Sequence, residues 1–145
     1  MKRSSSKEMK RYNHLHGEIE AAYHDASLKF EVSDSVLKIL YTICSFGNSL
    51  LLNDICRYTG LTKQTVNSAI RKLEGEDIIC LEAVDGKAKK VCLTKKGRQF
   101  ADKTACRLVE AENEIFESWS LEDIWKYLEL TERFLNSLKE KIEQF

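Results

Sequence analysis

The stretch from Asn53 to Leu93 constrains the fold of this chain more than any other. Its first half, NDICRYTGLTKQTVNSAIRKLE, predicts two short helices joined by a tight turn after Thr59-Gly60. Its second half, IICLEAVDGKAKKVCL, predicts a β-hairpin that turns at Asp85-Gly86. A helix-turn-helix that runs directly into a small hairpin is a winged helix, a module that usually inserts its second helix into a DNA major groove.

The second of these predicted helices separates an apolar face from a polar one. At 100° per residue, four apolar side chains fall together on a narrow face: Val66, Ala69, Ile70 and Leu73. No acidic residue occurs from Thr62 to Lys72, and Arg, Gln and Asn side chains can contact both phosphates and base edges. We therefore predict DNA contacts from Thr62, Lys63, Gln64, Thr65, Asn67, Ser68, Arg71 and Lys72. The alternative is a solvated face that contacts nothing.

The predicted hairpin carries basic residues close to its tip. Asp85 is the first residue of the predicted turn, and Lys87, Lys89 and Lys90 follow the turn. These four residues are our predicted wing contacts, because lysines at a hairpin tip suit a DNA phosphate or the minor groove. The alternative is that the lysines keep an edge strand soluble.

Charge is distributed unevenly along a chain whose formal net charge is zero. Residues 52–107 contain 12 Lys and Arg against 7 Asp and Glu, whereas residues 108–145 contain 4 against 10. Residues 1–51 contain 7 against 6. Basic charge therefore concentrates on the predicted winged helix, and a neutral total does not argue against a nucleic-acid partner.

Helices are predicted on both sides of the central stretch, which gives a mainly α fold with a small β-hairpin wing. We expect helices over Lys7–Phe30, from a Ser33-Asp34 cap to about Phe46, over Lys95–Glu117 as one long helix, and from Leu121 almost to the end. Ser49–Leu51 is expected to be extended beside the wing, and Asn53 to cap the helix that follows it. The predicted parts are 1–32, a disordered leader (1–6) and a dimerisation helix; 33–100, the DNA-binding domain; and 101–145, C-terminal dimerisation helices.

The last predicted helix has the clearest long periodicity in the chain. Its apolar positions alternate spacings of three and four, interrupted only by a threonine: Leu121, Ile124, Leu128, Thr131, Leu135, Leu138, Ile142 and Phe145. One helix cannot bury such a seam alone, so we predict packing across a two-fold axis; packing against the first helix of the same subunit is the alternative. The predicted dimerisation residues are Tyr12, Ile19, Leu128, Leu135, Leu138 and Ile142.

The strings LTKQTVNSAIRKLE and DGKAKKVCLTKKG make the chain resemble the MarR family of bacterial transcription regulators. The resemblance implies a homodimer joined through its first and last helices on a pseudo-palindromic operator of double-stranded DNA. It also implies repression of nearby genes and a small-molecule effector near the junction of the DNA-binding and dimerisation parts. The chain departs from the family pattern at Lys87, where arginine is usual, and at Asp77, where glycine is usual; the latter implies a reshaped exit from the recognition helix.

Other function classes find less support in the sequence. No apolar run approaches the roughly 20 residues of a membrane span, and the start lacks a signal peptide, so we expect a cytoplasmic, nucleoid-associated protein without membrane contact. No nucleophile motif or phosphate loop occurs, so no enzyme activity and no cofactor is expected beyond a possible effector. The alternative function is a winged-helix module that binds a protein partner.

Histidine and cysteine give no clear site in the sequence. His14, His16 and His24 have no i, i+4 spacing, so we predict no metal site. Five scattered cysteines are expected to be reduced, semi-buried apolar residues. If residues 82 and 92 pair, Cys80 and Cys92 lie diagonally across the hairpin, where oxidation would disturb the wing.

Overall fold

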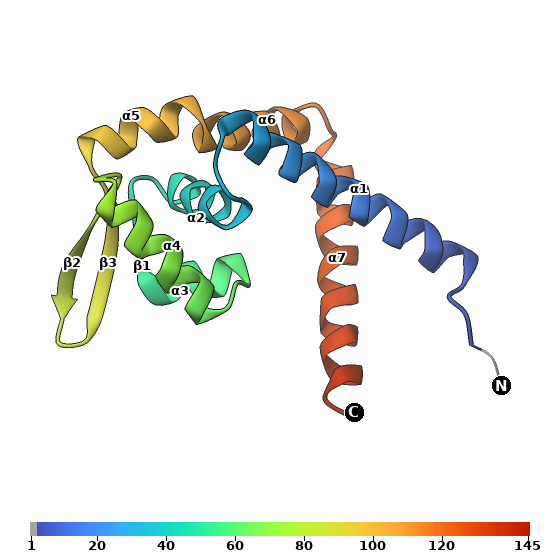
Figure 1. The fold of residues 1–145 in the computed structure, drawn as a ribbon. Coiled ribbons are helices and arrows are strands. Elements are labelled where there is room, and N and C mark those ends of the chain that lie inside the picture. The colour runs from blue at the N-terminus through green and yellow to red at the C-terminus, as the bar shows by residue number, and fades with distance from the viewer. Residues whose placement is uncertain (1–2) are drawn as a thin grey trace. The chain divides into compact units, whose positions relative to one another are not determined.

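The computed structural model describes residues 3–145, which form two compact units that divide between Arg107 and Leu108. The first two residues of the predicted leader 1–6 lie outside the described residues. The described chain forms seven helices and a three-stranded antiparallel sheet, which confirms the predicted mainly helical fold class (Figure 1). None of the helices in residues 3–145 has the length and apolar character that a membrane span requires.

The helices are α1 (Lys7–Phe30), α2 (Asp34–Ser45), α3 (Leu52–Thr59), α4 (Lys63–Gly75), α5 (Lys95–Lys103), α6 (Ala105–Glu117) and α7 (Leu121–Ile142). The strands are β1 (Ser49–Leu51), β2 (Ile79–Asp85) and β3 (Ala88–Leu93). The predicted bounds of α1 are therefore correct, and α7 begins at the predicted residue. Hydroxyl caps account for several starts, because Ser6, Ser33, Thr62, Thr94 and Ser120 each accept a backbone N–H of the following turn.

Helix α2 is the centre of the first unit's core. It packs against α1, α3, α4, α5 and β1, and its Ile39, Leu40 and Ile43 are fully buried. Most of the apolar residues of α2 are buried, as expected for a helix that other elements surround. The narrow apolar face of α4 lies against this core, because Val66, Ala69, Ile70 and Leu73 are all buried.

The sheet has the order β1-β3-β2, so the extended piece at residues 49–51 pairs with the second wing strand, as expected. One face of the sheet joins the core, since Ile79 and Val91 are buried. The predicted turn was off by one residue: Asp85 pairs with Ala88, and the two-residue loop is Gly86-Lys87. A bulge between Ala83 and Asp85 displaces the register, and Gly86 takes the positive φ of 38°.

The prediction that Asn53 caps the third helix was wrong. Helix α3 begins at Leu52, and its N-cap is Leu51, which provides no side-chain hydrogen bond. Leu51 is also the last residue of β1, so the chain turns from the strand directly into the helix. The strand pairing therefore determines where α3 starts, rather than a polar cap.

The prediction of one helix from Lys95 to Glu117 was also wrong, because the helix is interrupted at Thr104. The Thr104 hydroxyl donates to the Phe100 carbonyl at 2.8 Å, which is the acceptor that a continuous α-helix would give to the Thr104 amide. That amide instead donates to Ala101 at 3.0 Å. The backbone of Thr104 then leaves the helical region, with φ −130° and ψ −96°, and α6 begins at the next residue.

A close backbone contact, which we call the Ile78 junction, joins the exit of α4 to the start of α5. The Ile78 carbonyl accepts from the amide and the hydroxyl of Thr94, at 3.1 and 3.2 Å. The Thr94 hydroxyl also lies 2.6 Å from the Asp77 carbonyl oxygen. Gly97 is buried here, and a Cβ on it would overlap the Ile78 carbonyl group. Only glycine fits the first turn of α5 at this distance.

In the second unit, α7 contains no buried residue. Leu128, Leu135, Leu138 and Ile142 are between 43% and 50% exposed, so their apolar seam faces solvent in the single chain. Near the start of the helix, Tyr127 contacts the rings of Phe116 and Trp119 edge-on. Within the first unit, Tyr12 and Ile19 on α1 are similarly exposed, at 45% and 49%.

Candidate nucleic-acid interface

The outer face of α4 presents the polar side chains that the helical wheel placed there. Gln64, Ser68 and Arg71 are exposed, and Asn67 is half-buried beside them. The opposite side of the same helix is packed into the core, which fixes the direction in which these side chains point. No acidic residue interrupts this surface before Glu74, so its charge and its hydrogen-bonding groups suit a polyanion.

The start of α4 is held by its own hydroxyl groups. The Thr62 side chain accepts from the Thr65 amide at 3.2 Å and donates to the Thr65 hydroxyl at 2.8 Å. The hydroxyl proton of Thr62 is therefore used in a hydrogen bond within the protein, and the side chain acts as the N-cap of α4. Lys63 is exposed in the first turn.

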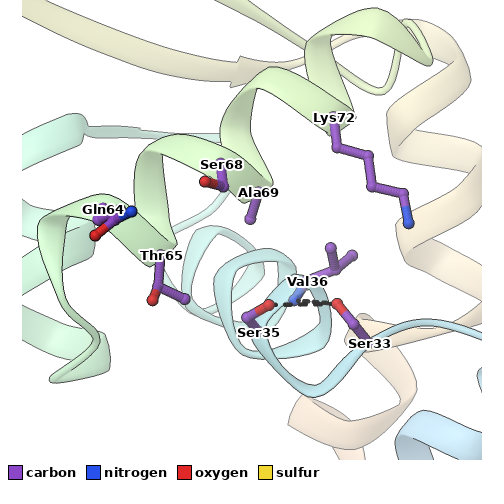
Figure 2. Close-up of a pocket in the computed structure, with 8 residues that line it drawn as sticks. All are labelled: Ser33, Ser35, Val36, Gln64, Thr65, Ser68, Ala69 and Lys72. Atoms are coloured by element: carbon purple, nitrogen blue, oxygen red, sulfur yellow. Dashed lines mark hydrogen bonds between the residues drawn. The ribbon is translucent and has the colours of Figure 1, made fainter.

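A groove of about 370 Å³ runs between α4 and the start of α2. Figure 2 shows Thr65, Ala69 and Lys72 directed from α4 toward the first turn of α2. The facing wall consists of Ser33 and Ser35, whose hydroxyl groups lie 3.3 Å apart, and Val36, whose amide donates to Ser33. Hydroxyl groups, one ammonium group and a helix N-terminus thus surround the groove, a combination that favours an anion.

One carboxylate lies at the same end of α2, and it is partly compensated. Nδ1 of His24 lies 2.9 Å from both carboxylate oxygens of Asp34. Hydrogen bonds from Ser27 and then from His24 hold the pKa of Asp34 below its ordinary value. His24 on α1 is therefore paired with the first residue of α2.

The wing does not present its lysines as one patch. Lys87 lies in the turn, while Lys89 and Lys90 are neighbours on β3 and so point to opposite faces of the sheet. Lys90 is half-buried directly across from Glu82, a pairing that the sequence analysis did not consider. Asp85 is exposed at the end of β2. Of the four predicted wing residues, Lys87 and Lys89 are thus the freest to contact a phosphate.

The cysteines form two pairs, of which the sequence analysis considered only Cys80 and Cys92. Cys80 and Cys92 pair directly across β2 and β3, so the diagonal placement expected from an 82–92 pairing was wrong. Burial, followed by the nearby Glu82 and Cys80, raises the pKa of the Cys92 thiol. The second pair is Cys44 and Cys106, whose sulfur atoms are 2.8 Å apart, and burial raises the pKa of Cys44. Cysteines separated by 62 residues leave no local spacing to recognise.

The departure at Asp77 does not reshape the exit of the recognition helix. Asp77 adopts the left-handed conformation itself, with φ 62°, directly after the C-cap Glu76. Its carbonyl is fixed by the Thr94 hydroxyl in the Ile78 junction. An aspartate therefore occupies the conformation that glycine adopts more easily.

The fold and this surface can be compared with known proteins. Residues 30–88, which span α2, α3, α4 and most of the wing, match the sequence profile described as MarR family. This match covers less than half of the chain and shows that these residues are similar to the MarR family of winged helix-turn-helix transcriptional regulators. That family consists of regulators and not of enzymes. No curated protein sequence matches the chain.

Solved structures of MarR-family proteins share the fold at low sequence identity. NMB1585, a MarR family regulator from Neisseria meningitidis, is 16% identical with a TM-score of 0.82, and the match covers 96% of this chain and 99% of that one. A MepR–DNA complex from S. aureus is 19% identical with a TM-score of 0.66, covering 93% and 99%. PcaV from Streptomyces coelicolor, in complex with its natural ligand, is 13% identical with a TM-score of 0.63, covering 94% and 99%.

Proposed function

We propose that this protein is a MarR-family, ligand-responsive repressor that binds a pseudo-palindromic operator as a homodimer. The observation that carries the proposal is the outer face of α4, which is exposed, polar and free of acidic residues while its opposite face is buried. Residues 33–100 form the DNA-binding part in this proposal, and 1–32 and 101–145 join the subunits. The MepR–DNA complex, which has the same fold, supports DNA as the partner.

The proposal assigns different contacts to the outer face of α4 and to the groove beside it. Gln64, Asn67, Ser68 and Arg71 contact base edges, since guanidinium and amide groups match the donor and acceptor patterns of the major groove. Lys72 holds a backbone phosphate in the groove. The hydroxyls of Thr65 and Ser35 line the same groove and donate to that phosphate. Lys63, Lys87, Lys89 and Lys90 add sequence-independent attraction, and Thr62 and Asp85 shape the elements that carry these lysines.

The apolar seam of α7 supports the homodimer. Leu128, Leu135, Leu138 and Ile142 repeat at heptad spacing and remain exposed in the single chain. Tyr12 and Ile19 on α1 add a second exposed apolar stripe. Exposed apolar stripes of this length are unusual on a monomer, and two winged helices held together would reach two half-sites one helical turn apart.

The response to an effector rests on the fold relatives alone. PcaV with its natural ligand shows that a protein of this fold binds a small molecule, and we extend that property to this chain without assigning lining residues. Repression follows if an occupied operator blocks transcription. Selection of bound sequences from a random DNA library identifies the operator and, from it, the controlled genes.

Arg71→Ala tests the proposed readout. Each good bidentate contact to a base contributes about 1–3 kcal/mol of discrimination, so we expect operator affinity to fall by this amount per half-site while affinity for unrelated DNA changes little. Arg133→Ala is the matched control, since it removes the same charge from α7, where Arg133 forms an exposed ion pair with Glu129. Fluorescence anisotropy gives the affinities, and a sizing column checks that both variants remain dimers.

Salt dependence separates this function from the alternative, a module that binds a protein. A phosphate contact contributes about −0.9 to the slope of log K against log salt, so removing one contact from each subunit of a dimer reduces the slope by about 1.8. Lys72→Ala and Lys87→Ala should each show this reduction. Absence of DNA binding, or binding that does not respond to salt, would contradict the proposed function.

A further inference from the structure

The solvent-facing side of the wing sheet gathers two thiols and a carboxylate. Cys80 and Glu82 are two residues apart on β2 and therefore point to the same face. Cys92 pairs with Cys80 across β3 and joins them on that face. Ile79 and Val91, which precede Cys80 and Cys92 on their strands, are buried on the other face. The strand pairing thus places three potential metal ligands side by side at the base of the wing.

The three donor atoms are close enough to share one ion. The two Sγ atoms and a carboxylate oxygen of Glu82 all lie within 4.8 Å of one another. A tetrahedral Zn²⁺ site has Zn–S bonds of about 2.3 Å and Zn–O bonds of about 2.0–2.2 Å, which brings sulfur ligands to about 3.8 Å apart. The donors therefore need to approach by no more than about 1 Å, within the reach of side-chain rotation on a fixed backbone.

We propose that the wing binds one thiophilic divalent metal ion, with Zn²⁺ as the representative, through Cys80, Glu82 and Cys92. Two thiolates and one carboxylate form a donor set that suits Zn²⁺ and discriminates against Mg²⁺ and Ca²⁺, which prefer oxygen ligands. Three protein ligands leave the fourth tetrahedral position to water. The proposed ligands include no histidine. The spacing of the three histidines in the sequence could therefore not indicate this site.

The ion would join the two wing strands without changing the wing's charge. Two thiol protons leave as one dication enters, so the net charge of the cluster stays the same. The ion instead restricts the movement of the hairpin, because it cross-links β2 and β3 at Cys80 and Cys92. Cys80 lies six residues before Gly86, and Cys92 lies five residues after Lys87, the two residues of the loop. Glu82 is at the same time drawn away from Lys90, which lies directly across from it.

Metal titration of the full-length protein tests the site. The reduced protein, kept in a phosphine reductant that prevents a Cys80–Cys92 disulfide, is titrated with Co²⁺ and then with Zn²⁺ as competitor. We expect one equivalent of Co²⁺ with the visible bands of tetrahedral coordination and a near-ultraviolet thiolate charge-transfer band of two-thiolate intensity. Zn²⁺ should abolish both signals.

Variants locate the ion. Cys80→Ser and Cys92→Ser should each lose stoichiometric metal binding. The thiolate charge-transfer band should fall in each variant to half its intensity or less. Glu82→Gln should weaken binding by at least about tenfold, the lower limit of losses seen even for second-shell partners. The double variant Cys44→Ser/Cys106→Ser is the matched control and should bind normally, because it removes the other neighbouring pair of thiols.

Three outcomes would overturn the proposal: no stoichiometric uptake of Co²⁺ or Zn²⁺ by the reduced protein, uptake that persists in Cys80→Ser, or uptake that is lost in the Cys44/Cys106 control. Cys80 is exposed, so its replacement by serine leaves the core unchanged, and circular dichroism verifies that each variant is folded. The spectrum of the unmodified protein counts thiolates independently of any variant. None of these readouts depends on DNA binding, so the site and the proposed function can fail separately.

Discussion

Gly97→Ala should destabilise the protein more than any other single methyl addition to its glycines. A Cβ at this position would overlap the carbonyl oxygen of Ile78 and lie 2.8 Å from its carbonyl carbon, where ordinary contact begins at 3.4 Å. The carbon would have to retreat by about 0.6 Å and the oxygen by more. Both atoms belong to backbone that cannot rotate away, since Ile78 is buried between α4 and β2.

The expected cost follows from two terms. Overpacking of a well-packed site costs about 1–3 kcal/mol. Displacement of the Ile78 carbonyl also weakens its two hydrogen bonds from Thr94, each contributing about 1 kcal/mol. The free energy of unfolding should therefore fall by about 3–5 kcal/mol, a large share of the 5–15 kcal/mol typical of a native protein.

Urea denaturation followed by circular dichroism measures this loss. Gly75→Ala is the matched control, because its added Cβ meets no atom within 4 Å and it lies at the last residue of α4. Alanine there should be neutral or should stabilise the protein by up to about 1 kcal/mol. If Gly97→Ala were within about 1 kcal/mol of the unmodified protein, the packing of the Ile78 junction described above would be wrong.

Three further predictions concern single side chains. Asp77→Gly should raise the free energy of unfolding by roughly 0.5 kcal/mol in the same urea assay, because glycine adopts a φ of 62° without the cost of a Cβ; a loss would show that the aspartate side chain stabilises the turn. The folded pKa of Asp34 lies below its ordinary value of 3.8, so the carboxylate contributes stability above that value and loses it as the pH falls through the folded pKa. Asp34→Asn should accordingly be less stable than the unmodified protein at pH 7, with the difference vanishing in strong acid, and a difference independent of pH would contradict this. Burial raises the pKa of Cys44, so iodoacetamide at mildly alkaline pH should label exposed Cys80 well before Cys44 in the folded protein; equal rates by peptide mass spectrometry would refute it.

The elements that were predicted correctly are those governed by local rules. The apolar face of α4 and the full extent of α1 follow from periodicity, which acts over one or two helical turns. The order of a helix-turn-helix and a hairpin follows in the same way. Most of the α4 residues expected to face DNA are exposed for the same reason, since burying one face of a helix determines the other.

The errors arose where a distant contact or a competing hydrogen bond decides the structure. The start of α3 depends on the pairing of β1 with β3, and the break at Thr104 depends on which group takes the Phe100 carbonyl. A bulge moved the hairpin loop by one residue and placed Cys80 directly opposite Cys92. Ser33 was recognised only as part of a helix cap and Ser35 was not considered, because the groove that they form with α4 joins segments about 30 residues apart.

The strand order β1-β3-β2 has a topological consequence. Ser49, Leu50 and Leu51 pair with Cys92, Val91 and Lys90, so the backbone from residue 49 to residue 92 forms a closed loop. Helices α3 and α4 lie inside that loop, and both of their ends are therefore tethered to the same strand, β3. Closing a loop of this length costs entropy once, when the sheet forms, and the enclosed helices then lose less freedom when they dock. The pairing of β1 with the wing thus restrains the helix-turn-helix at both ends. Separation of β1 from β3 should release the recognition helix before the β2–β3 pairing of the hairpin is lost.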